Sequence, residues 1–482
     1  MFVRTAPRLA ALFVATALSC PDVPWAQVLP HPPVVDRLPN GLSVVSVPFD
    51  SPGVAAYYTL VRTGSRDEVE AGHTGFAHLF EHMMFRGSRH YTAQQYELTM
   101  QRLGADNNAY TTEDFTLYTV LLPSASLPEL IPAEADRFRW LQYTEAEFQT
   151  ETRAVLGEYN RATSSPGLPM EEHLYELAFQ RHTYAHTTLG YLRDIEAMPG
   201  YYRHSIEFLR RFYTPDNCTI IVAGDFDRTR VLDLVRQNYG AWRGHRATAV
   251  IAPEPEQTAP RDRWLAWEGA SPRRLFQAYR VPAFGLSTAD SAALEVVYAL
   301  AFSPSSELYQ RLVVAEQKLT ELGTSEGMMH RDPGLFVIQA RLAADVTFDE
   351  ISAVIDTELT RIGRGAYPRE RIEAVVSHLR YALPMSVQAA PDAAELVARM
   401  MALTGDPGTL EQYVARLSAV TADDVARVAR TYLTQAHRAR VMLASAADAP
   451  SGALRIGPGG RSSASSGPPT SGPSPSSSPP GT

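Results

Sequence analysis

The amino-acid sequence predicts an α+β fold of two related domains in tandem, in which each domain is a mostly antiparallel sheet flanked by helices. Strand-like apolar segments such as 54–61 and 115–122 are mixed with long helical stretches such as 126–142. Neighbouring strand-like segments often follow one another without a helix that could cross back over a sheet. This pattern favours a largely antiparallel sheet over a doubly wound parallel one.

A repeated pattern near the ends of the two domains predicts that they are related. Residues 210–226 and 429–446 each contain an amphipathic helix that ends at a Tyr, then a polar turn and an apolar strand. Aligning Tyr213 with Tyr432 gives the offset between the two copies, 432 − 213 = 219. A period of this length predicts a duplicated domain.

Changes in composition predict where the domains begin and end. We expect a first domain at 36–248 and a second at 264–447, joined by a linker at 249–263 in which Pro and polar residues interrupt two apolar regions. From residue 448 to 482 the chain becomes rich in Ser, Pro and Gly. Such a segment cannot form a core, so we expect a disordered tail.

Residues 1–26 have the pattern of an export signal. Two arginines precede an apolar segment that is too short to span a bilayer, and prolines follow it. The ~20 apolar residues of a transmembrane helix occur nowhere else in the sequence. We therefore expect an exported protein, periplasmic or secreted, without a transmembrane segment. Cleavage after Ser19 or Ala26 fits the pattern, and Cys20 leaves a lipid anchor as a lesser alternative.

Charge and cysteine content exclude several classes of function. The net charge is −9 and the sequence pI is about 5.8, with no block of Lys and Arg of the kind that binds phosphates. A nucleic-acid partner is therefore not expected. Only two cysteines are present, Cys20 at the signal boundary and Cys218 at the start of an apolar run. This excludes a disulfide framework, and we expect Cys218 to be a core residue.

Residues 75–87, "GFAHLFEHMMFRG", carry the strongest functional pattern in the sequence. In a helix, His78 and His82 lie four residues apart on one face, with Glu81 beside them. Two imidazoles at this spacing can chelate zinc, and the adjacent carboxylate can take a proton from water that the metal activates. The alternative is a core helix whose histidines bond to the backbone. Three polar groups in one apolar patch would make that arrangement costly.

A catalytic zinc site usually has three protein ligands, so a third ligand is expected elsewhere. The best candidates are Glu151 and Glu158 in "ETRAVLGEYNR". They lie seven residues apart, two helical turns, and so share a face that could pack against the histidine helix. Either glutamate could instead be a solvated surface residue.

Together these motifs resemble the M16 family of metalloendopeptidases, which includes pitrilysin and the mitochondrial processing peptidase. The resemblance extends over nearly the whole chain between the expected signal and tail. The segments that carry it are 62–68, 78–88, 103–118, 151–161, 212–226, 305–319 and 332–342.

The resemblance implies a role for each candidate residue. In that family the third ligand is a Glu at a fixed separation beyond the second His, which here selects Glu158, since 158 − 82 = 76. The resemblance thus implies one Zn²⁺ per chain, held by His78, His82 and Glu158, with Glu81 as the general base. Glu151 matches an acidic position that supports a ligand. Asn108 and Ala109 match the strand to which a substrate peptide adds through its backbone.

One segment departs from the family pattern. Members that complete their own site carry an Arg and a Tyr within a second-half segment of the form L-R-E-K-x-x-L-x-Y. This chain has Val313 at the Arg position and no Tyr near Thr320 or Glu321. The resemblance then implies a catalytic subunit that pairs with a noncatalytic paralogue, with a homodimer as the alternative.

Two other classes of function stay open. One is a noncatalytic scaffold of the same fold. The other is a peptide-binding protein with a structural zinc ion, which would need a fourth ligand. His182 and His186 also lie four residues apart, but the Thr and Gly around them predict a loop, so we expect no second metal site there.

Overall fold

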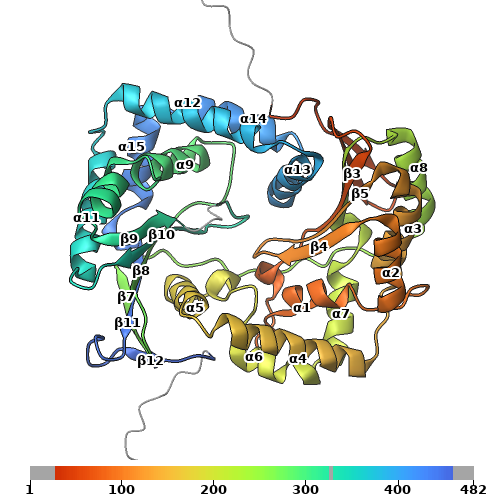
Figure 1. Cartoon of the computed structure of the whole chain (residues 1–482), viewed down its shortest axis with the longest axis horizontal. Coiled ribbons are helices and arrows are strands. Elements are labelled where there is room, and N and C mark those ends of the chain that lie inside the picture. Colours follow the sequence, from red (N-terminus) through yellow and green to blue (C-terminus); the bar gives the residue numbers. More distant parts are fainter. Residues whose placement is uncertain (1–27, 325–328, 460–482) are drawn as a thin grey trace, which may run out of the picture.

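The computed structural model describes residues 28–324 and 329–459, and in this part the chain forms two halves, each built on a six-stranded sheet (Figure 1). The expected signal at 1–26 and residues 460–482 of the expected tail lie outside the described residues. Within the described ranges, no helix combines the length and the apolar character needed to cross a membrane.

The first half contains the sheet that carries the candidate site. Its strands are β1 (Val34–Arg37), β2 (Ser43–Pro48), β3 (Val54–Val61), β4 (Asp106–Thr111), β5 (Thr116–Pro123) and β6 (Cys218–Gly224). Across the sheet their order is β1-β2-β6-β3-β5-β4. Only β2 and β6 are parallel, and every other neighbouring pair is antiparallel.

Eight α-helices accompany this sheet in the described part of the first half. They are α1 (Phe76–Met83), α2 (Ala93–Leu103), α3 (Leu127–Trp140), α4 (Glu145–Ala162), α5 (Gly167–Ala178), α6 (Leu192–Ala197), α7 (Tyr202–Phe212) and α8 (Arg228–Tyr239). Strand β4 forms one edge of the sheet, and α1 packs against β4 and α4.

The second half repeats this plan. Its strands are β7 (Arg261–Trp267), β8 (Arg273–Arg280), β9 (Leu319–Thr324), β10 (Leu335–Leu342), β11 (Arg438–Ser445) and β12 (Leu454–Ile456), in the order β12-β7-β11-β8-β10-β9. Its helices are α9 (Asp290–Ala301), α10 (Glu307–Tyr309), α11 (Phe348–Gly363), α12 (Arg369–Ser386), α13 (Ala390–Thr404), α14 (Thr409–Ser418) and α15 (Ala422–Tyr432). The predicted fold class, two mostly antiparallel sheets flanked by helices, is therefore confirmed.

The two sheets have matching strand orders and directions over five strands. The order β2-β6-β3-β5-β4 corresponds to β7-β11-β8-β10-β9, and the parallel pair β2–β6 corresponds to β7–β11. The starts of β3 and β8 differ in sequence number by 273 − 54 = 219, as the sequence predicts. For β6 and β11 the difference is 438 − 218 = 220. The alignment of Tyr213 with Tyr432 is thus wrong by a single position, because α15 includes Tyr432 whereas α7 ends at Phe212.

Each sheet is apolar on both faces, and each half lends one helix to the other half's sheet. On β3, Ala55 and Tyr57 face the helices of the first half, whereas Ala56 and Tyr58 belong to a second core that contains α13. In the same way α5 from the first half covers one face of the second sheet, through residues such as Met170. Figure 1 shows α5 beside the second sheet and α13 beside the first. Burial of apolar surface therefore joins the halves.

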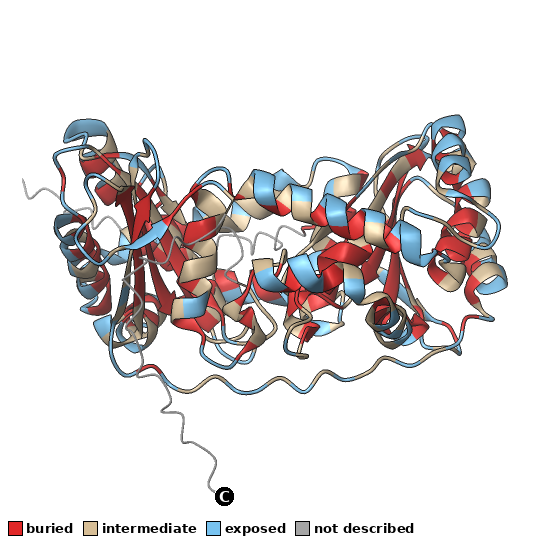
Figure 2. Ribbon diagram, turned by 90° about the horizontal axis from the view of Figure 1, so that it is seen from below, coloured by how far each residue is buried: buried red, intermediate tan, exposed pale blue. Residues whose placement is uncertain are grey.

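An extended segment links the halves along one side of the molecule (Figure 2). It has no helix or strand between Tyr239 and Arg261, so β7 begins inside the range expected for the linker, 249–263. The segment is fixed to both halves. Glu254 accepts hydrogen bonds from the backbone N–H groups of 180–182, and the buried side chain of Gln257 donates to the carbonyl oxygen of Arg438.

The chain is not disordered at the start of the expected tail, 448–482. Residues 454–456 form β12, which lies parallel to β7 with Ile456 buried. So short an edge strand needs only one buried apolar side chain. The composition of this stretch therefore does not distinguish it from a disordered tail.

Candidate metal centre

Helix α1 begins at a position that only glycine fills easily. Gly75 has φ 89°, and a Cβ atom there would lie 2.6 Å from the carbonyl oxygen of Leu189. The carboxylate of Glu68 accepts hydrogen bonds from the N–H groups of Gly75 (2.8 Å) and Ala77 (2.7 Å). A carboxylate at this end satisfies free N–H groups and interacts favourably with the helix dipole. These contacts fix the start of the helix that carries the motif.

The structure brings His78, His82 and Glu158 together. Helix α1 presents both imidazoles to α4, where Glu158 lies. The Oε2 atom of Glu158 is 3.6 Å from Nε2 of His78 and 3.4 Å from Nε2 of His82. One potential ligand atom from each of the three residues lies within 4.8 Å of the others, and among the described residues no other group of this kind is found. Two imidazoles and a carboxylate are a ligand set that zinc commonly takes.

Glu151 lies behind His82 rather than among the three converging atoms. Its Oε2 atom is 3.7 Å from Nδ1 of His82, and its Oε1 atom forms an ion pair with Arg86. Burial raises the pKa of Glu151, but contacts with His82 and Arg86 outweigh it and hold the pKa below its usual value. An ionised carboxylate at Nδ1 favours the tautomer that leaves Nε2 free to bind a metal.

The protonation of the two histidines also fits a metal centre. Burial lowers the pKa of His78 to about 4, so its imidazole is neutral at pH 7. Its Nδ1 atom is buried without a hydrogen-bond partner. The pKa of His82 is raised, first by its contact with Glu151 and against the effect of burial. A bound cation would compensate the carboxylates that gather here, so the residues present fit zinc.

Glu81 is directed to β4 by a hydrogen bond. The hydroxyl of Thr111 donates to its Oε2 atom at 2.7 Å. Burial raises the pKa of Glu81, and the Thr111 hydrogen bond opposes that shift. A carboxylate whose pKa is raised toward neutrality is better suited to accept and return a proton.

The expected substrate-binding residues lie on β4, the strand that holds Thr111. Asn108 pairs with Thr119 and Ala109 with Tyr118 of β5, so the other side of β4 is a sheet edge. The N–H of Ala109 donates to Oδ1 of Asn108 at 2.9 Å. A free edge of this kind can accept another strand.

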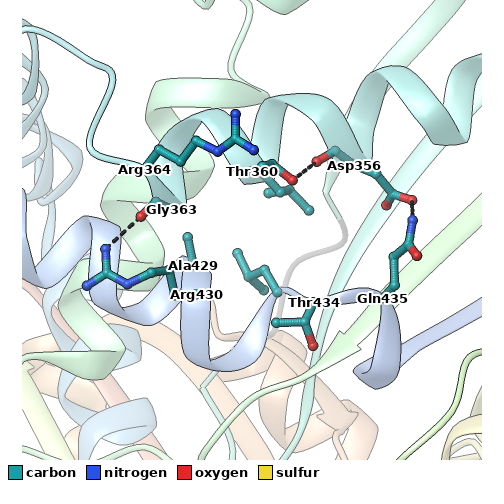
Figure 3. Close-up of a pocket in the computed structure, with 10 residues that line it drawn as sticks. Asp356, Thr360, Gly363, Arg364, Ala429, Arg430, Thr434 and Gln435 are labelled. Carbon is teal, nitrogen blue, oxygen red and sulfur yellow. Dashed lines mark hydrogen bonds between the residues drawn. The ribbon is translucent and has the colours of Figure 1, made fainter.

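A cavity of about 790 Å³ lies between the halves, next to the end of β4. Thr112 and Glu113 line it from the first half, and Glu295 and Glu395 line it from the second. Figure 3 shows a different pocket, of about 320 Å³, between α11 and α15 of the second half. None of its lining residues belongs to α1, α4 or β4, so it is not part of the metal centre.

The other histidines that the sequence singles out have separate partners. His182 Nε2 lies 2.9 Å from Asp332, whereas His186 Nδ1 lies 3.0 Å from the carbonyl oxygen of Thr187. The two rings thus point to different partners.

Three further residues contact the candidate centre or its helix and are not indicated by the sequence motifs: Thr111, Arg86 and Glu68. Arg86 stands four residues after His82, the helical spacing that also joins His78 to His82, which is a signal that could have revealed it. Thr111 follows the expected substrate strand by two residues. Nothing in the sequence alone marks Glu68 as the residue that caps α1.

The second half has no counterpart of this centre among its described residues. There α9 packs on α12 as α1 packs on α4. The positions that correspond to His78, Glu81 and His82 at the offset of 219 hold Val297, Leu300 and Ala301, and all three are buried in an apolar core. The same framework therefore holds polar side chains in one half and hydrocarbon in the other.

Comparisons with known proteins agree with this architecture. Residues 50–191 match the family described as Insulinase (Peptidase family M16), and residues 203–379 match the Peptidase M16 inactive domain. The zinc protease PqqE of Helicobacter pylori is 25% identical over 411 residues, which cover 84% of this chain and 91% of that protein. The mitochondrial-processing peptidase subunit beta of Blastocladiella emersonii is 25% identical over 422 residues, which cover 83% of this chain and 86% of that protein.

A solved structure of a protease from Helicobacter pylori has the same fold, with a TM-score of 0.80 at 24% sequence identity, over 86% of this chain and 100% of that one. Fold and sequence matches together define a two-domain peptidase architecture. The chain belongs to the M16 peptidase family.

Zinc binding should weaken as the pH falls. A ligand imidazole must be neutral, and the pKa of His82 is raised above its ordinary value of 6.5, so protons compete with the metal below that pKa. We expect the apparent dissociation constant to rise about tenfold per pH unit there. Isothermal titration calorimetry of the full chain between pH 8 and pH 5.5 measures this. Glu151→Gln should shift the dependence to lower pH, whereas an affinity that stays constant throughout would contradict the assignment of His82.

Proposed function

We propose that the chain is a zinc-dependent endopeptidase that hydrolyses peptide bonds in peptides or unfolded segments. His78, His82 and Glu158 would hold one Zn²⁺, and Glu81 would act as the general base. The observation that carries this proposal is the convergence of three ligand atoms within 4.8 Å, with the half-buried carboxylate of Glu81 beside the two histidines on the same helix. Membership of the M16 family and the zinc protease among the relatives support it.

The residues of the chain divide the chemistry among them. When bound, zinc would supply a Lewis acid that lowers the pKa of water and polarises a peptide carbonyl. Glu81 takes the proton of the attacking water and later passes it to the leaving amine. Thr111 orients Glu81 by donating to one carboxylate oxygen, so the other oxygen is left for the proton. Glu151 and Arg86 keep His82 in its ligand orientation.

A peptide substrate would add to β4 as a further strand. Asn108 and Ala109 lie on this edge, and main-chain hydrogen bonds would hold the peptide with little dependence on its side chains. The Oδ1 atom of Asn108 accepts a hydrogen bond from the N–H of Ala109. A substrate carbonyl could replace the Asn108 side chain as the acceptor.

The chain would act as the catalytic member of a pair with a noncatalytic paralogue. The segment that replaces the family's Arg and Tyr includes the π-helical turn Gln310–Ala315, where Val313 packs against the main apolar core of the second half. Thr320 and Glu321 lie in β9 and are exposed. The side chains of Val313 and Glu321 cannot donate a hydrogen bond to a developing oxyanion, and the neutral hydroxyl of Thr320 lacks the charge that an arginine would bring. One relative is, by its name, the beta subunit of a peptidase. A homodimer is the alternative.

Export to the periplasm or the outside of the cell is also part of the proposal. It rests on the pattern of residues 1–26. A lipid anchor on Cys20 is the lesser alternative.

Removing the metal should abolish peptide cleavage, and restoring it should recover the activity. The full chain, treated with a chelator and dialysed, is assayed on an unstructured fluorogenic peptide and then titrated with Zn²⁺. Activity should return in proportion to the metal and saturate at one equivalent. His82→Asn should lose both metal and activity, whereas His378→Asn, at an exposed position of α12, should keep both. Cleavage that resists the chelator would contradict a metallopeptidase, and stoichiometric zinc without cleavage, even with the paralogue, would favour a scaffold.

The isolated chain should cleave slowly and respond to its paralogue. Removing one oxyanion donor commonly lowers kcat by about a hundredfold or more. Mixing the chain with an M16 paralogue that lacks the H-x-x-E-H motif should raise kcat by a similar factor and shift the mass by light scattering to that of a heterodimer. Full activity from a monomer, or no response to the paralogue, would contradict the pairing and leave the metal centre untouched.

A further inference from the structure

Residues 62–68, the first part of the segment between β3 and α1, are held by side chains and carbonyl groups of the second half. Arg62 donates from Nε to the carbonyl oxygen of Ala402 at 2.7 Å and from Nη2 to that of Leu403 at 2.9 Å. These carbonyls end α13, the helix that the second half lends to the first sheet. A guanidinium at this end of the helix satisfies free carbonyl groups, and its positive charge interacts favourably with the dipole of α13.

Two oppositely charged pairs continue this contact toward α1. Arg66 donates from Nε to Oδ2 of Asp332 at 2.7 Å, and its Nη2 lies 2.6 Å from the same oxygen. The side chain of Asp67 is completely buried and lies 3.8 Å from Nη1 of Arg331. Arg246 approaches Asp67 to 3.3 Å from the segment that links the halves. Two consecutive residues, Arg66 and Asp67, thus have charged partners in the second half.

Asp332 and its neighbours are themselves held in place. His182 Nε2 lies 2.9 Å from Oδ2 of Asp332, and the Asp332 N–H donates to the hydroxyl of Tyr184. Asp114 accepts from Tyr184 and from the N–H of Arg331. A guanidinium and a carboxylate that are both mostly withdrawn from water depend strongly on their partners, because removing one leaves the other charge uncompensated.

Arg66 and Asp67 immediately precede the residue that caps α1. Glu68 follows Asp67 in sequence, and its carboxylate holds the N–H groups of Gly75 and Ala77. His78 is the next residue after Ala77. A displacement of Arg66 and Asp67 would therefore be transmitted through one residue to the start of α1.

We propose that Arg331 and Asp332 are positioning residues for the metal centre: they hold Asp67 and Arg66, and through Glu68 they set the position of α1 and its ligands. The second half, which has no ligands of its own at the corresponding helix, thereby determines the geometry of the centre in the first half. This inference rests on the proposed function for its kinetic consequence, but the position of α1 can be tested without metal or substrate.

The first test measures hydrogen exchange in the metal-free full chain. Asp332→Asn removes one charge with little change in shape, and Asp332→Glu keeps the charge. Asp345→Asn, an exposed aspartate in the same half, is the matched control. Asp332→Asn should speed exchange in peptides covering 68–84 by about tenfold, well below the melting temperature. Asp332→Glu should restore most of the protection, and Asp345→Asn should match the wild type.

The second test uses the Co²⁺-substituted chain, whose visible absorption reports on the ligands around the ion. Asp332→Asn should change this spectrum and lower kcat about tenfold, with KM within about twofold of the wild type. Arg331→Lys, which keeps the charge, provides a milder variant if Asp332→Asn does not fold, and should show smaller changes in the same directions.

The possible outcomes separate the inference from the proposed function. If Asp332→Asn lowers only the melting temperature, and exchange in 68–84 and the cobalt spectrum match the wild type, the pairs merely join the halves and the inference is wrong. If the wild-type chain cleaves no peptide while exchange in 68–84 responds to Asp332→Asn, the peptidase proposal fails and the positioning role stands.

Discussion

The rest of the structure depends on one constraint: both sheets are apolar on both faces. The helices of each half cover only one face of its own sheet, so the other face must be covered by something else. In this protein α13 covers the first sheet and α5 covers the second. Because apolar burial is the main stabilising contribution in folding, separating the halves would expose both second cores. The exchange of helices therefore makes the two repeats one structural unit.

This unity explains how an apolar framework can carry a polar centre. Two imidazoles and three carboxylates between α1 and α4 would be costly in a core unless they are paired, hydrogen-bonded or bound to a cation. In the second half Val297, Leu300 and Ala301 fill the corresponding space at no such cost. The first half instead surrounds its polar groups with partners: Glu151 and Arg86 behind His82, and Thr111 beside Glu81.

Much of the fold and part of the site could be predicted from the sequence. Helical spacing alone placed His78, Glu81 and His82 on one face, and the structure has them on α1. Spacing could not choose between Glu151 and Glu158, because both share a face of α4. The choice of Glu158 came from the resemblance, and the structure places its Oε2 atom nearest to both Nε2 atoms.

Other features depend on contacts that a sequence pattern does not contain. The apolar faces of α5 and α13 show that each must pack against something, but not which sheet. The role of Glu68 arises from a loop that returns to α1, and β12 is too short to give a periodic pattern.

The measurement that tests the central claim most directly is the metal content and peptidase activity of Glu81→Gln in the same preparation. In the proposed site Glu81 lies beside the three ligands without being one of them, and the amide of Gln is close in size to the carboxylate. The variant should bind one zinc ion with the affinity of the wild type and cleave an unstructured peptide at least about a hundredfold more slowly. If the variant loses zinc in proportion to its activity, or retains full activity with its zinc, Glu81 is not the general base.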